Sequence, residues 1–278
     1  MLFLKIMLPI TFFIIGIIFA SFSNMLMYRF ANHKPIIKDS RSYCPKCNHQ
    51  IAWYDNIPLF SYLILRGKCR HCKEAISPRY FLVELYGGVS FVVIYFLYVC
   101  LYPTKTFEIS NNIYDLINAF TLAFSLLFLL VCAYVDSKTK EVPISMMITL
   151  LVLSTINFVS SWIIDGFSFT HLLGFIIPAG ALLLVYFIST LLLKVEPIGM
   201  ADIIIFSVLG LLGGAINLLS IVLFSSLICS IVELIKIKKT GEKRVIPFVP
   251  YIYIGTLITF LFTPLIIQGI DILIGGLF

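Results

Sequence analysis

Charged residues are scarce in this sequence of 278 residues. Asp, Glu, Lys and Arg together make up 12% of it, whereas about a quarter of a typical soluble domain is charged. Hydrophobic residues make up 60%, and the mean hydropathy is +1.04. This scarcity excludes an ordinary soluble domain. We therefore predict an all-α polytopic membrane protein whose main partner is the lipid bilayer.

Long apolar runs account for most of the chain, and a shorter one leaves the number of helices open. Seven runs are long enough to cross a bilayer as helices: 4–27, 80–101, 113–135, 143–164, 171–193, 215–235 and 250–276. The shorter run begins at Asp202 and ends in a cluster of Gly210, Gly213 and Gly214. Residues 202–235 could therefore form one long broken helix or a hairpin turned by these glycines. The hairpin gives about eight transmembrane helices.

Basic residues are nearly absent from one side of this arrangement. With eight helices, 18 of the 20 Lys and Arg residues fall in segments on a single side: 28–79, 136–142, 194–201 and 236–249. Because basic loops stay in the cytoplasm, we predict that both termini are extracytoplasmic. One long helix would place the basic residues after it outside, so the charge pattern favours the hairpin. The net charge of +6 thus indicates membrane orientation and not nucleic acid.

The first apolar run could instead be a cleaved signal peptide, with Ala20 and Ser21 as a poor cleavage site. Cleavage would export the basic segment that follows it. That outcome contradicts the rule that basic segments remain in the cytoplasm. We therefore expect an uncleaved first helix.

Four of the 7 cysteines form two CxxC pairs in the one sizeable polar region, residues 28–79. Cys44 and Cys47 are separated from Cys69 and Cys72 by 21 residues, a spacing similar to that of the two knuckles of a zinc ribbon. The reducing cytoplasm disfavours disulfides, so we predict a metal site. Four thiolates complete a tetrahedron, and the predicted Zn²⁺ is therefore structural.

The other histidines and cysteines considered as metal ligands are better interpreted as solvated or packing residues. His49 and His71 could replace a thiolate, but solvated loop residues are the better interpretation because four cysteines already suffice. Cys100, Cys132 and Cys229 lie in apolar runs, where free cysteine commonly packs as a small hydrophobic residue.

Two aspartates stand at the ends of apolar runs. Asp136 closes the run 113–135, and Asp202 opens the short run that ends in the glycine cluster. An ionised carboxylate at membrane depth costs several kcal/mol, so such residues are candidates for a functional site. The alternative is that both are helix-boundary charges in contact with lipid headgroups.

Several motifs together resemble the bacterial type IV prepilin peptidases over nearly the whole chain. The N-terminal ones are Cys44-Pro45-Lys46-Cys47, Trp53-Tyr54-Asp55-Asn56-Ile57-Pro58, Arg66-Gly67-Lys68-Cys69 and Val83-Glu84-Leu85. Asp136 with Pro143 and Gly199-Met200-Ala201-Asp202 are similar to that family's two catalytic-aspartate motifs, and Ile246-Pro247-Phe248-Val249-Pro250 resembles its late Pro-Phe-Gly-Pro motif. The Cys-rich region is the most specific part of the resemblance.

Three positions depart from the family pattern. Ala201 replaces the second Gly of the usual GxGD, Ile204 replaces a Lys, and Val249 replaces the Gly of the late motif. A positive φ at residue 201 would strain an Ala. The peptidase assignment still holds, but kinetics and substrate range could differ from those of typical members.

The resemblance implies two domains with different activities. Residues 1–101 would hold the first two helices and, at 28–79, a cytoplasmic four-cysteine zinc-binding domain similar to a methyltransferase. Residues 113–278 would form a six-helix membrane aspartic peptidase. Asp136 and Asp202 would be its catalytic pair: one carboxylate takes a proton from water while the protonated one polarises the scissile carbonyl. Which is acid and which is base cannot be assigned for a coupled pair.

The same resemblance implies the substrate and the second activity. The enzyme would cut the basic leader from type IV prepilins or pseudopilins at the cytoplasmic face of the bacterial inner membrane, in pilus assembly or protein secretion. It would then N-methylate the new terminus with S-adenosylmethionine. The chain has no Gly-rich Rossmann fingerprint, so methylation depends on the resemblance alone. Asp55 and Glu84 are candidates for that site, or else a turn residue and a helix-end charge.

Two alternatives stay open. The chain could be a peptidase whose Cys-rich domain is only a structural platform. It could also be a non-enzymatic scaffold or transporter whose carboxylates bind ions, with Pro197-Ile198-Gly199-Met200 breaking a helix before Asp202. The lack of inverted repeats and the predicted zinc ribbon disfavour the transporter. The sequence makes no prediction of the oligomeric state.

Overall fold

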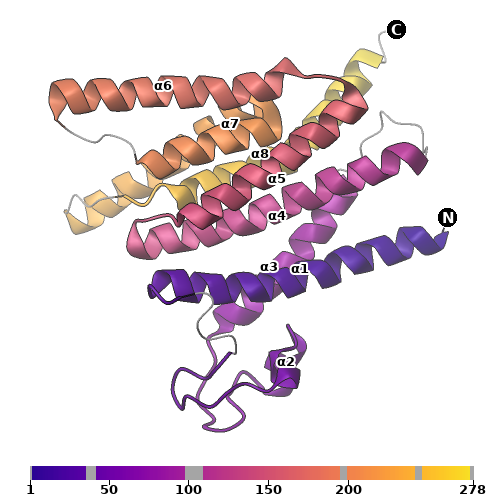
Figure 1. The fold of residues 1–278 in the computed structure, drawn as a ribbon, viewed down its shortest axis with the longest axis vertical. Helices are drawn as coiled ribbons and strands as arrows, with labels where there is room; N and C mark the ends of the chain where they lie inside the picture. The colour runs from indigo at the N-terminus through magenta and orange to yellow at the C-terminus, as the bar shows by residue number, and fades with distance from the viewer. Residues whose placement is uncertain (1, 36–41, 98–108, 195–198, 242–245, 276–278) are drawn as a thin grey trace. The chain divides into compact units, whose positions relative to one another are not determined.

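The computed structural model describes residues 2–35, 42–97, 109–194, 199–241 and 246–275 (Figure 1). Three residues discussed above, Cys100, Pro197 and Ile198, lie outside this part of the chain. Within it the regular structure is helical, and β-pairing is limited to two isolated bridges. The predicted all-α class is confirmed.

Nine helical elements follow one another in the described part of the chain. They are α1 Leu2–Ala31, the 3-10 turn η1 Trp53–Asn56, α2 Phe60–Ile64, α3 Pro78–Tyr95, α4 Ile109–Thr139, α5 Ile144–Asp165, α6 Phe169–Leu193, α7 Met200–Thr240 and α8 Val249–Gly275. Among the described residues, 5 helices are long and apolar enough to cross a membrane. The chain is thus a membrane protein, and the count of about eight spans stays a prediction.

The chain folds into two compact units, Met1–Tyr95 and Phe96–Phe278. In the first unit α1 packs along α3, and in the second α4 packs on α5 and α8 while α7 packs on α6 and α8. The predicted domain boundary between residues 101 and 113 falls largely on residues 98–108, outside the described part of the chain. It stays a prediction.

Helix α7 breaks at Gly214, whose φ of 78° is not helical. Two side chains bind carbonyl groups at the break: His171 contacts the Leu211 oxygen at 2.9 Å, and the Asn217 amide donates to the Gly213 oxygen at 2.8 Å. Buried carbonyls need such partners in a membrane, where water cannot supply them.

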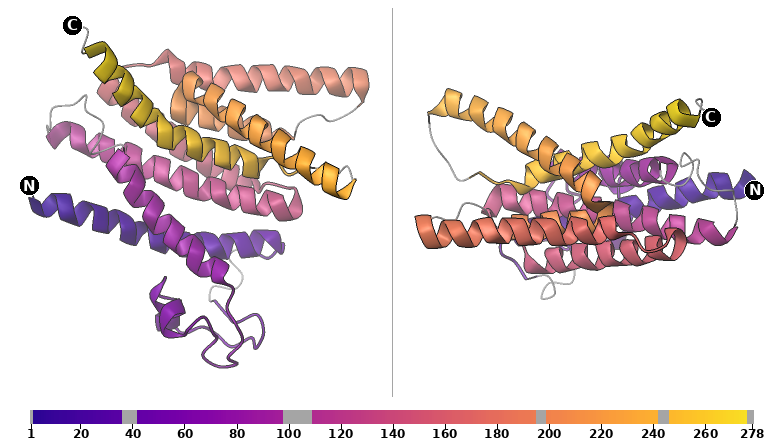
Figure 2. Two further views of the ribbon diagram at one scale, coloured as in Figure 1. Left: turned by 180° about the vertical axis from the view of Figure 1, so that it is seen from behind. Right: turned by 90° about the horizontal axis from the view of Figure 1, so that it is seen from above.

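Both ends of α7 lie at the start of α8. Near one end, the rings of Phe206 and Phe248 are 6.0 Å apart. Near the other, Tyr251 donates to the Glu233 carboxylate at 2.5 Å. A straight helix of 41 residues would be about 60 Å long, so the chain must reverse at Gly214, as Figure 2 shows. The predicted hairpin is correct, and the single long helix is excluded.

The backbones of α6 and α7 touch at Gly174 and Gly210. A Cβ atom at Gly210 would lie 1.9 Å from the Gly174 oxygen, and one at Gly174 would lie 2.4 Å from the Gly210 oxygen. Glycines at a crossing let membrane helices approach closely enough for extensive backbone packing. This contact holds the first half of α7 in place, and with it Asp202.

We expect Gly210→Ala to destabilise this unit by about 1–3 kcal/mol, because overpacking forces the helices apart. Thermal unfolding in detergent, followed by circular dichroism, measures the change as a lower midpoint. Gly180→Ala is the matched control, since a Cβ atom at this α6 position meets nothing within 4 Å. Equal midpoints for the two variants would contradict the close contact.

Candidate active site and metal centre

Asp136 lies in the last turns of α4 and is 7% exposed. Its Oδ2 atom accepts a hydrogen bond of 3.1 Å from the backbone N–H of Val249. Val249 is the first residue of α8, and the first N–H groups of a helix have no partner within it. A carboxylate is favoured at such a helix terminus. The late Pro-Phe-Val-Pro segment therefore directly positions the first aspartate.

The departure at residue 249 does not remove this contact. The donor is a backbone N–H, which Val offers as well as Gly. Val249 is also absent from the described residues with positive φ, so its conformation does not require Gly. The structure thus explains why Val is tolerated at this position.

Asp202 occupies the first turn of α7 and is half-buried. Gly199 is the N-cap of this helix, and its backbone N–H donates to the Asp202 carboxylate. An acidic residue at the third helical position commonly folds back in this way. A Cβ atom on residue 199 would lie only 3.3 Å from Asp202 Oδ2, so Gly leaves room for the carboxylate.

The other two departures in this motif cause no visible strain. Ala201 lies in the first turn of α7, and the one non-helical residue described inside this helix is Gly214. The concern about a positive φ at residue 201 therefore does not apply. Ile204 is 39% exposed, whereas Ile203 and Ile205 are buried. A Lys at position 204 would lie on the outer face of the helix.

The structure brings Asp136 and Asp202 together although 66 residues separate them in the chain. The two carboxylates are close enough to repel each other electrostatically. Two neighbouring carboxylates repel each other when both are ionised, so such a pair can share one proton. One protonated and one ionised carboxylate can act together as acid and base.

A polar network fixes the helix turn beside this pair. The hydroxyl of Tyr251 donates to Glu233, and Lys236 donates to both Glu233 at 2.6 Å and Tyr251 at 3.1 Å. Tyr251 is two residues after Val249, so the network ties the second half of α7 to the turn that supports Asp136. Sequence reasoning missed it. In the sequence, the one local indication of this network is the spacing of Glu233 and Lys236, which are three residues apart and can form an ion pair on one face of a helix.

The four predicted cysteines form a cluster in the first unit. Their sulfur atoms all lie within 4.8 Å of one another, and the sulfurs of Cys44 and Cys72 are 3.8 Å apart. Four thiolates at the usual Zn–S distance of about 2.3 Å would be separated by about 3.8 Å. A disulfide needs about 2.05 Å. The cluster could hold a metal ion.

The two knuckles of this cluster share one backbone pattern. Cys44 donates its N–H to the His49 oxygen, and Cys69 donates to the Glu74 oxygen. An antiparallel bridge closes each knuckle, at Tyr43–Gln50 and Lys68–Ala75. Each also contains a residue with positive φ after its second cysteine, Asn48 and Lys73. The structure is therefore a duplicated knuckle, as in a zinc ribbon.

Backbone donors and neighbouring thiols perturb two of the cysteines. The N–H groups of Cys72 and His71 lower the pKa of Cys69 to about 7. For Cys72 the N–H of Glu74 favours the thiolate, but burial and the surrounding thiols raise its pKa to about 11. Four thiols this close cannot all ionise cheaply without a cation among them. The donor set therefore fits a soft divalent metal ion.

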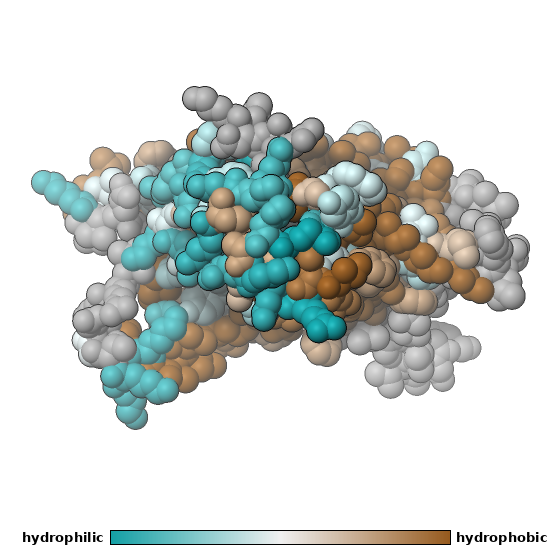
Figure 3. Space-filling view, turned by 90° about the horizontal axis from the view of Figure 1, so that it is seen from below, coloured by the Kyte–Doolittle hydropathy of each residue, from teal (hydrophilic) through white to brown (hydrophobic). Residues whose placement is uncertain are grey.

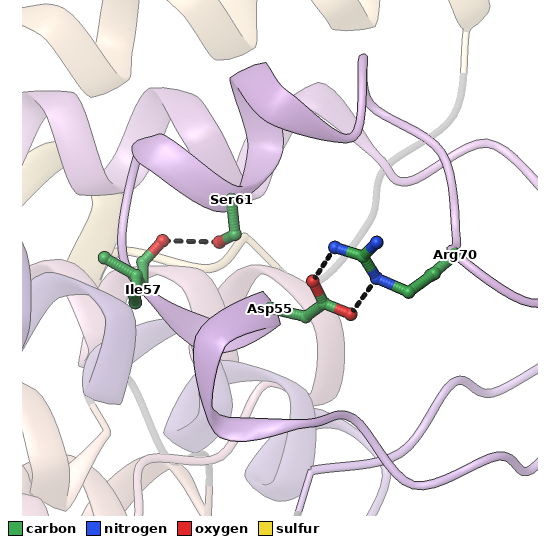
Figure 4. Close-up of polar contacts among 4 residues, drawn as sticks. All are labelled: Asp55, Ile57, Ser61 and Arg70. Atoms are coloured by element: carbon green, nitrogen blue, oxygen red, sulfur yellow. Dashed lines mark hydrogen bonds and ion pairs between the residues drawn. The ribbon is translucent and has the colours of Figure 1, made fainter.

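The remaining candidates have partners within the protein. His49 and His71 stack with ring centroids 3.4 Å apart, outside the ligand cluster. Asp55 forms a bidentate pair with Arg70 at 2.7 and 2.6 Å (Figure 4), and this hydrogen bonding lowers the pKa of Asp55. Glu84 is buried and accepts the N–H of Leu59 at 2.8 Å. Asp55 is thus a paired residue of the turn η1, whereas Glu84 lies within α3 and not at its end.

Comparison with known proteins gives consistent matches over both units. Residues 14–98 match the sequence model of the Bacterial Peptidase A24 N-terminal domain, and residues 123–234 match that of the Type IV leader peptidase family. A prepilin leader peptidase/N-methyltransferase of Vibrio cholerae is 35% identical over 80% of this chain and 84% of its own length.

More distant relatives have similar names. The Myxococcus xanthus prepilin leader peptidase/N-methyltransferase is 31% identical over 83% of this chain and 63% of its own length. In Escherichia coli, a type 4 prepilin-like proteins leader peptide-processing enzyme is 28% identical over 88% of this chain and 90% of its own length. No solved structure matches significantly.

Proposed function

Because the chain belongs to the type IV leader peptidase family, we propose that it cleaves the basic leader of type IV prepilins or prepilin-like proteins and N-methylates the new N-terminus. The observation that best supports cleavage is the meeting of Asp136 and Asp202, with Val249 donating to Asp136. This pair offers the acid and the base that peptide hydrolysis requires.

In the proposed mechanism the ionised aspartate takes a proton from a water molecule, which attacks the scissile carbonyl carbon. The protonated aspartate donates a hydrogen bond to the carbonyl oxygen and stabilises its developing charge. The proton held by the pair then passes to the leaving amine. The Val249 N–H stays on Oδ2 of Asp136 and keeps that carboxylate in one orientation throughout. Hydrolysis in this scheme needs no metal.

We propose that Cys44, Cys47, Cys69 and Cys72 hold a structural Zn²⁺, for which the donor chemistry fits. S-adenosylmethionine would supply the methyl group. The two carboxylates suggested for its site, Asp55 and Glu84, are already bonded to Arg70 and Leu59. We therefore assign no residue to the methyl donor.

The proposed location is the bacterial inner membrane, with both termini outside the cytoplasm. The basic segments that precede α3, α5, α7 and α8 support this orientation. It places the cytoplasmic ends of α4 and α7, which carry the two aspartates, at the level where a prepilin leader meets the membrane. Residues 28–79 would serve methylation, and residues 113–278 would serve cleavage.

A purified enzyme should convert a prepilin into a product that lacks its leader and carries one additional methyl group. The measurement is mass spectrometry of a prepilin incubated with the detergent-solubilised enzyme, with and without S-adenosylmethionine. Shortening in both reactions, with methylation in one, is the expected result. Shortening alone would favour the alternative in which the Cys-rich domain is a platform. An uncut prepilin would overturn the proposed cleavage.

A further inference from the structure

A short segment between the two knuckles exposes large apolar side chains. Phe60, Leu63 and Ile64 of α2 are 62%, 60% and 73% exposed, and Trp53 of η1 is 80% exposed. Together with the exposed Ile57 they form what we call the apolar patch. Figure 3 looks onto the face with the Cys-rich segment and shows apolar side chains beside a larger group of polar ones. Exposed apolar patches of this kind mark surfaces that bind another protein or a membrane.

Helix α2 is attached partway along α1 and α3, the two long helices of its unit. The N–H of Leu59, at the start of α2, donates to Glu84 of α3 at 2.8 Å, and Ser21 of α1 also hydrogen-bonds Glu84. Glu84 lies about 9 Å along the helix axis from Pro78, the first residue of α3. Ser21 lies about 15 Å along the axis from Ala31, the last residue of α1. The start of α2 therefore lies well inside the ends of both helices.

The outer surface of α1 and α3 is apolar at this level. Phe22 is next to Ser21, and Leu82 and Leu85 flank Glu84; all three are exposed large hydrophobic residues. Such residues on a membrane-spanning helix face lipid. The level at which α2 attaches is therefore within the apolar part of the bilayer or at its boundary.

The backbone around α2 is consistent with little access to water. Beyond the bond from Leu59 to Glu84, the N–H groups of Leu65, Gly67 and Lys68 donate to carbonyl oxygens within the same segment, at 2.9 to 3.1 Å. A loop in water can leave such groups to the solvent, whereas non-helical backbone at membrane depth must satisfy them internally. The buried Glu84 carboxylate thus substitutes for water at the first N–H of α2.

Basic side chains follow the apolar patch directly. Between residues 53 and 79 the acidic residues are Asp55 and Glu74, against five basic ones: Arg66, Lys68, Arg70, Lys73 and Arg79. Apolar and aromatic residues next to such a basic group are typical of segments that bind an anionic membrane surface. The charge of the segment is therefore complementary to lipid headgroups.

We propose that α2 is an interfacial helix whose apolar patch lies in the bilayer, at the boundary between headgroups and acyl chains, with the basic residues against anionic headgroups. The bilayer would then hold the segment between the knuckles, and the cysteine cluster with it, at the membrane surface. This inference does not depend on the proposed function. It requires that α1 and α3 cross the membrane.

The test uses a single tryptophan as a reporter. Trp53 and Trp162 are replaced by Phe, and Leu63→Trp is introduced into this background. The full chain is placed in nanodiscs of phosphatidylethanolamine and phosphatidylglycerol, with or without bromine on the acyl chains near the headgroup. Lys46→Trp is the matched control, because Lys46 is an exposed residue of the first knuckle. Phe60→Trp replaces Leu63→Trp if the latter variant does not fold.

We expect brominated lipid to reduce the emission of the α2 reporter at least about twofold and aqueous iodide to quench it weakly. The Lys46→Trp reporter should show the reverse. Strong iodide quenching without bromine quenching at residue 63 would place α2 in water and overturn the proposal. Protection from both quenchers would also overturn it, because another part of the chain or a protein partner would then cover the patch.

Discussion

Replacing either Asp136 or Asp202 with Asn will reduce leader cleavage by roughly 100- to 10,000-fold, the range in which a general acid or base contributes to catalysis. Asn has nearly the shape of Asp but cannot accept or release a proton at this step. In Asp136→Asn the amide oxygen can still accept the Val249 N–H, so the start of α8 should stay in place. The rate of prepilin cleavage, measured by mass spectrometry, checks the prediction.

Two controls separate lost chemistry from lost structure. Glu141→Gln makes the same change from carboxylate to amide at an exposed residue shortly after α4, and it should leave cleavage unchanged. Both Asn variants should also retain the unfolding midpoint and metal content of the parent protein. The double variant should be little worse than either single one, because the two carboxylates act as a unit. Cleavage above a tenth of the parent rate in either Asn variant would exclude the pair as acid and base.

The parts of this protein that follow from the sequence are those with a local or compositional cause. The hairpin of α7 could be predicted because three glycines stand where the charge pattern requires a reversal, and the structure has the break at Gly214. The cysteine cluster could be predicted because each CxxC spacing brings two thiols to one turn. In these cases neighbouring residues suffice to define the geometry.

Contacts between distant segments leave no comparable pattern. The bond from Val249 to Asp136 spans 113 residues and uses a backbone N–H, which every residue except Pro possesses. The sequence therefore shows that residue 249 departs from the family pattern, but not that the departure is harmless. The contact between Gly174 and Gly210 likewise requires the packing of α6 on α7. The interfacial position of α2 needs the Glu84–Leu59 bond, which no periodicity in the chain indicates.

Replacing Cys44 or Cys69 with Ser will release the bound metal and unfold the Cys-rich segment without unfolding the membrane helices. The described part of this segment holds only a 3-10 turn, a five-residue helix and two isolated bridges, too little to form a stable core alone. Structural zinc supplies about 10–16 kcal/mol in small zinc-binding peptides, which exceeds what the few other contacts can provide. Metal analysis should find one ion per parent chain and none in the variants, and limited proteolysis should cut the variants between residues 42 and 76.

Cys229→Ser is the control, because Cys229 lies in α7 outside the cluster, and it should keep both the metal and the protection from protease. Exchange of the metal then tests whether its role is structural. Four thiolates leave no open coordination position, and Cd²⁺ also prefers soft sulfur ligands. The Cd²⁺-loaded enzyme should therefore keep the fold of the segment and cleave prepilin at nearly the parent rate. Loss of cleavage in a folded, Cd²⁺-loaded enzyme would mean that the metal takes part in the chemistry, and the hydrolysis scheme built on Asp136 and Asp202 alone would then be wrong.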